Sequence, residues 1–331
     1  MDSTPLLSAV GGLPGPNTLQ DHPAFLRASH SPWRFIPQNI LVIARGLLLA
    51  YLATIAATGA DYKLTQESDY TKWRLLFDFS VVSFVLVLIY HVITFSWTFT
   101  HLYYPNPEDE GGIEGYVISA MSLPSNMASL RKQFYFTMFY TTTTVFAFMN
   151  STIYWFITRQ QAQGDAAEPA PPSESGSPDD DGEVWGWGDG RYPPPGAPFS
   201  DLFGEGWFKG FNIFNLYAIT SIIMAVEILF LNSIKHSYAI GSHIFGLVAF
   251  AGVYLGWAAI GKSLTDWWAF DWLDVSKVGS EEAVTAYSIG FVLLAPTMFT
   301  LMQGFVGIRE GLTRSLQESR VAAAAQEALD T

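Results

Sequence analysis

The chain has no cysteine, which excludes disulfide bonds, thiolate metal sites and a cysteine nucleophile. Charged residues are also scarce, at 14% of 331 residues, and lysine and arginine form no basic patch along the sequence. Because nucleic-acid binding depends on a basic surface, this composition argues against a nucleic-acid partner. We therefore expect no metal, no other cofactor and no nucleic acid.

Long apolar stretches dominate what is present: half of all residues are apolar and 15% are aromatic. Each stretch holds the ~20 residues that a helix needs to cross the ~30 Å hydrocarbon core of a membrane. Lipid offers the backbone no hydrogen-bond partners, so such stretches must be helical. The sequence predicts an all-α polytopic membrane protein with six transmembrane helices in one bundle, over residues 39–60, 75–100, 134–158, 208–232, 240–262 and 284–308.

Polar segments divide the chain into five parts. Residues 1–38 are rich in Pro, Ser and Gly, which predicts a disordered N-terminal tail before the first three helices at 39–158. Residues 159–207 hold ten acids against two arginines, which leaves −8 of the chain's net charge of −13. This composition predicts a solvated, low-complexity loop before the last three helices at 208–308. Residues 309–331 form a C-terminal tail, for which we expect an amphipathic or plain soluble helix.

Lysine and arginine do not determine the orientation, because eight fall outside the helices on each side of the predicted bundle. Two features favour cytosolic termini. The acidic loop has no basic cluster to retain it in the cytosol, and Asp2, Leu6 and Leu7 fit the acidic dileucine pattern that clathrin adaptors read there. The pattern is short and also arises by chance. It predicts a clathrin adaptor as partner and an endomembrane location (vacuolar, lysosomal or endoplasmic reticulum) rather than the plasma membrane.

Ionisable side chains inside the predicted helices are the first candidates for a functional site, because burying them in a membrane is costly. Glu227 lies among apolar neighbours in the fourth helix, and Arg45 lies six residues into the first. His91 and Asp78 lie in the second helix, with Asp78 near its start, where the interface hydrates it. One interpretation is structural: Glu227 pairs with Arg45 or His91 and holds the bundle together. The other is a site that handles protons or orients a ligand.

A series of individually weak motifs suggests a family. They are Y-T-K-W at 70–73, F-Y-F-T-M-F-Y-T-T-T-T-V-F-A-F at 134–148, Y-W at 154–155, N-I-F-N-L-Y at 212–217, H-S-Y at 236–238, Y-L-G-W at 254–257 and W-A-F-D-W-L-D at 268–274. Glu227 lies in the second half of the helix that N-I-F-N-L-Y opens. Over about residues 39–308, without the acidic loop, this order resembles the FAR-17a/AIG1-like (androgen-induced gene) membrane proteins.

The resemblance implies an intramembrane hydrolase that cleaves fatty acid esters of hydroxy fatty acids, with Thr71 as nucleophile and membrane lipids around it. A hydroxyl nucleophile needs a nearby base, and the family has a histidine where this chain has Tyr217. Residues 208–226 contain no histidine, so the resemblance implies the family's fold with altered or lost lipid-ester hydrolysis. Two other classes remain open, a non-catalytic membrane scaffold and a small-solute or proton-coupled transporter.

Overall fold

The computed structural model describes residues 23–65, 72–104, 111–124, 126–127, 129–159, 207–236 and 239–330. Within these ranges the regular structure is helical, without strands. Five of the described helices are long and apolar enough to cross a membrane. They are α4 (Gln38–Thr65), α5 (Phe79–Tyr103), a composite helix Trp207–Leu231, α12 (Ile240–Thr265) and the part of α14 (Glu281–Asp330) up to Leu316.

The composite helix, which we call span four, is interrupted twice along its length. It runs through α10 (Trp207–Phe214), the π-helical segment η4 (Asn215–Ile219), α11 (Thr220–Val226) and a second π-helical segment, η5 (Glu227–Leu231). In a π-helical turn the backbone N–H bonds to the carbonyl five residues back, as Asn232 N does to Glu227 O at 3.0 Å. Each such turn shifts the backbone hydrogen bonds by one residue, and so changes which carbonyls can accept hydrogen bonds from other segments.

The remaining predicted helix, the third in the chain at 134–158, forms α7 (Leu130–Ile153) and the π-helical turn η3 (Tyr154–Thr158). It is not among the five helices that are apolar enough to span by composition, and protein covers it: α7 contacts α5, α11, α12 and α14, and residues 140–150 are all buried. Thr142 and Thr144 donate hydrogen bonds to the carbonyls four residues back in the same helix. Hydroxyl groups are tolerated inside membrane bundles in this way.

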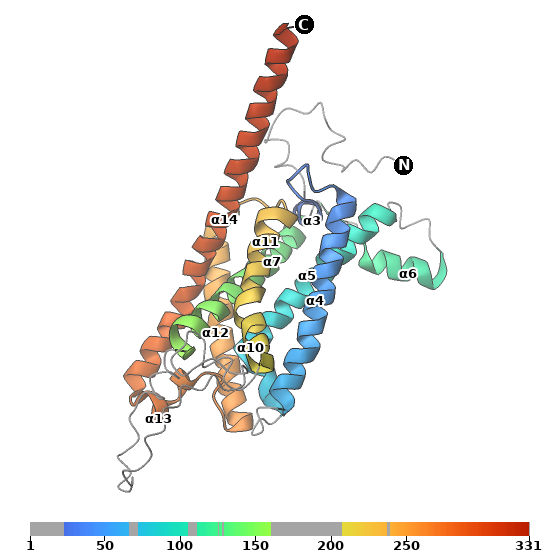
Figure 1. The fold of residues 1–331 in the computed structure, drawn as a ribbon. Coiled ribbons are helices and arrows are strands. Elements are labelled where there is room, and N and C mark those ends of the chain that lie inside the picture. Colours follow the sequence, from blue (N-terminus) through green and yellow to red (C-terminus); the bar gives the residue numbers. More distant parts are fainter. Residues whose placement is uncertain are drawn as a thin grey trace, which may run out of the picture.

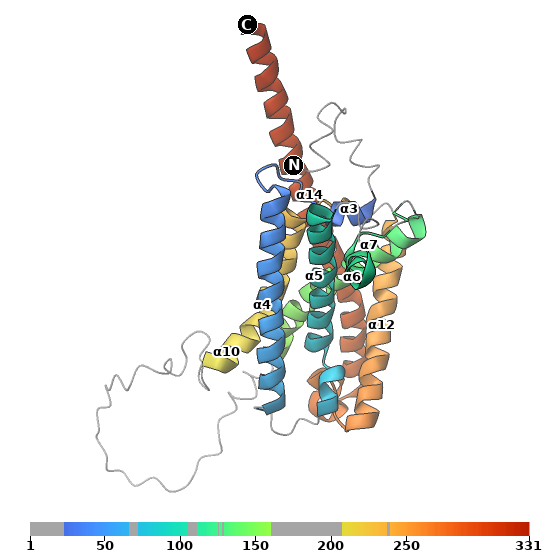
Figure 2. The same ribbon diagram turned by 90° about the vertical axis from the view of Figure 1, so that its right-hand side faces the viewer.

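The helices alternate in direction, so that the bundle has two distinct ends (Figures 1 and 2). At the termini end lie α3 (Ala24–Ala28), the starts of α4, α7 and α12, and the end of span four, and α14 projects beyond it. At the opposite end, the loop end, lie η1 (Lys72–Leu76), η6 (Asp271–Leu273), α13 (Val275–Val278) and the starts of α10 and α14. α7 therefore runs between the same two ends of the bundle as its neighbours.

The outer surface is apolar where lipid would surround it. Leu47 and Val253 are each 68% exposed, and Phe245 is 76% exposed. The interior combines aromatic packing, such as Phe79 against Tyr254 and Phe291, with buried polar groups. An apolar exterior around a partly polar interior suits lipid as the surrounding solvent. The chain is an integral, multi-pass membrane protein.

One of the polar segments is more ordered than the sequence predicts, and a loop contains an additional helix. The prediction of a disordered tail is wrong for residues 23–37, because Phe25 of α3 packs between Trp97 and Phe136 and is buried. The loop after α5 contains α6 (Gly112–Met121), which extends sideways from the bundle beside α5 and exposes apolar side chains (Figure 1). The expected C-terminal helix is confirmed, since α14 continues to Asp330. Residues 1–22 and 160–206 lie outside the described residues.

This topology predicts that the acidic loop and the termini face opposite sides of the membrane. The described residues that flank the loop, Arg159 and Trp207, belong to helix ends away from the projecting end of α14. In sealed vesicles, a tag at residue 1 should be cleaved by protease on the cytosolic side, and a tag near residue 175 should be protected. A tag after residue 331 should behave like the first. Equal cleavage of the first two tags contradicts this topology. Cleavage of the tag near residue 175 with protection of the tag at residue 1 reverses the orientation and removes the sorting role of Leu6 and Leu7.

Candidate functional site

The most densely bonded polar region lies where span four ends. The last four carbonyls of a helix have no partner within it, and inside a membrane they need one from the protein. Here each carbonyl of the final turn accepts a hydrogen bond from the side chain of another segment. Ile228 O is bonded by Arg309 Nη1 at 2.9 Å, Leu229 O by Trp33 Nε1 at 2.6 Å, Phe230 O by Ser31 Oγ at 2.6 Å, and Leu231 O by Arg45 Nη2 at 2.8 Å.

We call these four side chains the carbonyl cap. Two of them are cations, which also suits the negative end of the helix dipole. Arg309 further donates to Asn232 O at 3.0 Å and Ile234 O at 2.5 Å, beyond the helix. Arg45 also donates to Ala28 O at 2.6 Å and so ties α3 to the same point. The cap thus joins the N-terminal segment, α4, span four and α14.

Glu227, at the first position of η5, is the acid of this region. Its Oε1 accepts from Arg45 Nη2 at 2.9 Å and from the Tyr90 hydroxyl at 3.0 Å. The Arg45 and Glu227 side chains are 1% and 0% exposed. The expectation that Glu227 faces the interior and pairs with Arg45 is confirmed. Pairing explains how the membrane accommodates a carboxylate that would otherwise cost about 2.5–3.5 kcal/mol on insertion scales.

Three participants of this region were not identified from the sequence. Arg309 directly follows the last apolar stretch and reads as the start of a solvated tail, yet its side chain is 2% exposed. Tyr90 and Tyr140 read as core aromatics, and their rings pack 5.3 Å apart. Tyr140 also accepts a hydrogen bond from Asn232 Nδ2 at 3.2 Å. An arginine at a span boundary is the only sequence signal for this set.

The other two polar candidates in the predicted second helix lie apart from each other. His91, 1% exposed, is midway along α5 beside Tyr90, and its Nδ1 bonds to Val87 O at 2.8 Å. Asp78 is the N-cap of α5 at the loop end, where it accepts from Ser80 N at 2.8 Å and pairs with Lys63 Nζ at 2.5 Å. Asp78 therefore fixes the junction of α4 and α5, a structural role.

Tyr217, the residue at the family's histidine position, lies in η4. Its ring stacks on Tyr154 with centroids 3.9 Å apart and an interplanar angle of 12°. Its carbonyl accepts from Trp155 Nε1 at 3.1 Å and also from the Ser151 hydroxyl. The neighbouring Leu216 carbonyl accepts from an asparagine of α7. The backbone of this first interruption of span four is thus bonded to α7 and η3.

Thr71 lies outside the described residues, and the chain resumes at Lys72. The segment that follows it packs on the loop-end part of α12: Trp257 Nε1 donates to Leu76 O at 2.8 Å. Phe77 touches the same helix one turn later, where a Cβ on Gly261 would lie 2.5 Å from its ring. His243 begins the other end of α12, and 18 residues separate it from Gly261, or about 27 Å of helix.

The remaining described histidines are also away from the loop end. His30 and His101 pack ring to ring at the termini end, 5.0 Å apart. His236 precedes α12 and bonds to Gln303 Oε1 at 2.6 Å. None of these three histidines lies near Lys72, where the chain resumes at the loop end. Asp2, Leu6 and Leu7 lie outside the described residues.

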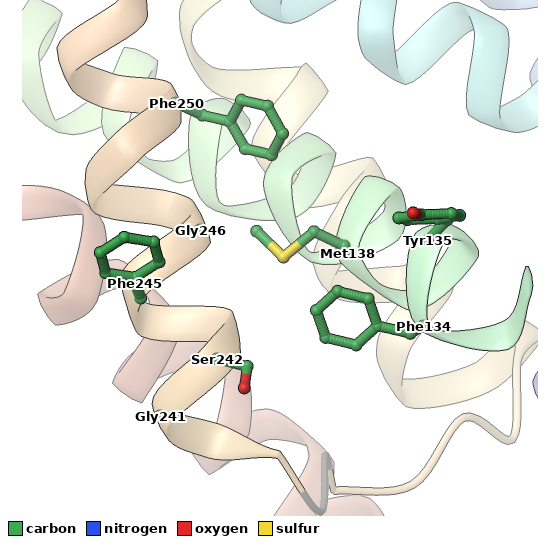
Figure 3. A pocket seen from close by; sticks show the side chains of 8 residues that line it. All are labelled: Phe134, Tyr135, Met138, Gly241, Ser242, Phe245, Gly246 and Phe250. Atoms are coloured by element: carbon green, nitrogen blue, oxygen red, sulfur yellow. The ribbon is translucent and has the colours of Figure 1, made fainter. Parts of the chain in front are cut away.

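An apolar groove opens at the termini end between α7 and α12, with a volume of about 460 Å³ (Figure 3). Aromatic side chains and Met138 form most of its wall, and Gly241, Ser242 and Gly246 form the α12 side. The helices are in close contact at Gly246, where a Cβ would lie 2.9 Å from the sulfur of Met138. A second, smaller groove of about 350 Å³ lies between α5 and α6. Among the described residues no group of three or more histidines and acids is placed to hold a metal.

Removing either partner of the buried ion pair should destabilise the protein strongly. Arg45→Met and Glu227→Leu should each lower the free energy of unfolding by about 3–5 kcal/mol, because each leaves an uncompensated buried charge. The double variant should lose less than the sum of the two. Denaturant unfolding in detergent micelles measures this, with the exposed Arg34→Met as the matched control. A Glu227→Leu protein as stable as the wild type contradicts the role given to the pair.

Comparison with known proteins assigns no family: no family model, no curated protein and no solved structure matches the chain.

Proposed function

We propose that this protein is a lipid-binding membrane protein that holds one acyl chain of an anionic lipid in the groove between α7 and α12. The observation that carries the proposal is the groove itself. Its wall is apolar and aromatic, and its α12 side includes the exposed Phe245 and Phe250 of a membrane-spanning helix. A volume of about 460 Å³ lies within the range of small-molecule and cofactor pockets.

The charge at the rim favours an anionic headgroup. Arg131 is exposed at the start of α7, and its Nε donates to the hydroxyl of Tyr135, a wall residue, at 3.0 Å. Lys132 follows it and is also exposed. Basic residues at a membrane surface attract anionic lipids by about 1 kcal/mol each. A lipid whose chain enters the groove between Phe134 and Ser242 would place its headgroup near these cations.

Binding without hydrolysis is supported by the separation of the groove from the described residue next to Thr71. The groove and His243 are at the termini end, whereas the chain next to Thr71 resumes at the loop end. A general base must come within hydrogen-bond reach of the hydroxyl that it activates. We therefore propose that the chain resembles the androgen-induced gene family in architecture and lipid binding, with weak or lost ester hydrolysis.

A transporter is the less well supported alternative. Transporter sites use interrupted helices whose open backbone groups bind substrate near the midplane. Span four is interrupted, but the carbonyls of η5 already accept hydrogen bonds from other segments of this chain. Those of Leu216 and Tyr217 are bonded in the same way. A non-catalytic scaffold remains compatible with lipid binding, since a resident lipid also stabilises a bundle.

Filling the groove should abolish lipid binding without disturbing the fold. A Cβ at Gly241 meets open space, so Gly241→Leu should occupy the groove without a clash. In nanodiscs, crosslinking of a photoreactive phosphatidylglycerol to peptides of α7 and α12 should fall several-fold. Gly252→Leu is the matched control, because it adds the same side chain on the same helix in open space, outside the groove.

A second variant tests the preference for an anionic headgroup. Arg131→Gln should reduce crosslinking of phosphatidylglycerol but not of phosphatidylcholine. Unchanged crosslinking in both Gly241→Leu and Arg131→Gln contradicts the groove as the lipid site.

Hydrolysis is tested with purified protein and a fatty acid ester of a hydroxy fatty acid. We expect no turnover above background in the wild type and no effect of Thr71→Ala, because the family's histidine is replaced by Tyr217. Turnover gained in Tyr217→His and lost again in Tyr217→His with Thr71→Ala identifies a degenerate site. Robust wild-type turnover that Thr71→Ala removes overturns the proposal that hydrolysis is weak or lost.

A further inference from the structure

Three buried polar atoms around the ion pair have no hydrogen-bond partner among the described residues. They are Arg45 Nε, Glu227 Oε2 and His91 Nε2. All three side chains are at most 1% exposed. An unpartnered polar atom in such a place costs free energy of about 1–3 kcal/mol, and more when charged. Three within one ion-pair environment therefore call for a common explanation.

The chemistry of each atom is determined by the bonds that its neighbours make. His91 Nδ1 faces the carbonyl oxygen of Val87, which only accepts, so Nδ1 carries the proton. In the neutral imidazole, Nε2 is then an acceptor. Glu227 Oε2 is the second acceptor, because Oε1 already takes the bonds from Arg45 and Tyr90. Arg45 Nε–H is a donor.

The three side chains are neighbours: Arg45 and Tyr90 both bond to Glu227 Oε1, and the His91 ring packs on that of Tyr90. In a guanidinium group, the Nε–H lies on the same edge as Nη2, and Nη2 is the atom bonded to Glu227 Oε1. The free donor and the free carboxylate oxygen thus belong to the two partners of one ion pair. His91 follows Tyr90, whose hydroxyl is bonded to the same carboxylate, and both Glu227 and Arg45 act electrostatically on its ring.

We propose that a single buried water molecule is bound between Arg45 Nε, His91 Nε2 and Glu227 Oε2. The two acceptors, His91 Nε2 and Glu227 Oε2, each need a donor, and the Arg45 Nε–H needs an acceptor. Water is the one common small molecule that supplies two donors and an acceptor. It accepts from Arg45 and donates to the imidazole and the carboxylate. Buried waters typically make about three hydrogen bonds to otherwise unsatisfied groups.

The surroundings argue against the main alternatives. A bound cation would be repelled by two arginines, Arg45 and Arg309. Arg309 lies in this region and interacts electrostatically with Tyr140. If His91 instead shared a proton with Glu227, its ring would be positively charged. Three positive groups, Arg45, Arg309 and His91, would then lie near one carboxylate. A neutral molecule that donates twice completes the cluster without adding charge. It also links α5 to α4 and span four at the level of the ion pair.

Magic-angle-spinning NMR of the full chain in lipid bilayers tests the site. Labelling with ¹⁵N-histidine and ¹³C-carbonyl valine identifies His91, because its Nδ1 faces a valine carbonyl. The corresponding nitrogens of His30 and His243 face Leu26 and Ala239. We expect His91 protonated at Nδ1 only, with a correlation between Nε2 and water protons. His243 serves as the internal comparison in the same sample.

Either of two outcomes overturns the proposal. Protonation of both His91 nitrogens shows an imidazolium bonded directly to Glu227. A neutral ring whose Nε2 has no water correlation shows a dry site. Neither outcome depends on a variant that folds, and neither bears on the groove between α7 and α12, so the two proposals fail independently.

Discussion

Pairing the last carbonyls of span four inside a membrane is the constraint on which the rest of this structure depends. The helix ends at Leu231, at the termini end of the bundle, and its last four carbonyls have no acceptable partner in lipid. Four side chains from three separate segments supply the missing donors. Two of them are arginines, because a guanidinium group offers several donors in one plane and bonds to carbonyls of different segments at once.

This requirement explains features that otherwise look unrelated. The polar segment before α4 is ordered because Ser31 and Trp33 donate to span four and Ala28 O accepts from Arg45. The buried positive charge of Arg45 in turn requires a counterion, which Glu227 supplies within the same turn. The costly ionisable residues of the interior thus form a structural unit, and its remaining unpaired atoms are those of a hydration site.

The candidate binding surface is separate from that unit. The groove lies between α7 and α12 at the termini end and is bounded by apolar side chains rather than by the ion pair. Close contact at Gly246 sets its floor, since any larger residue would push Met138 aside. A rigid, internally bonded core and a lipid-facing groove are compatible, because the first requires satisfied polar groups and the second requires only shape and apolar surface.

The sequence alone determined the class of protein, the positions of five membrane helices and the pairing of Glu227 with a polar partner. These follow from local composition, since an apolar run of this length must be a helix in lipid and an isolated buried acid is too costly. Only the tertiary structure decided that α7 is enclosed, that residues 23–37 fold into the bundle and that Arg309 is interior. Those outcomes depend on which carbonyls span four leaves unpaired and which distant side chains reach them, and no local pattern in the sequence contains that information.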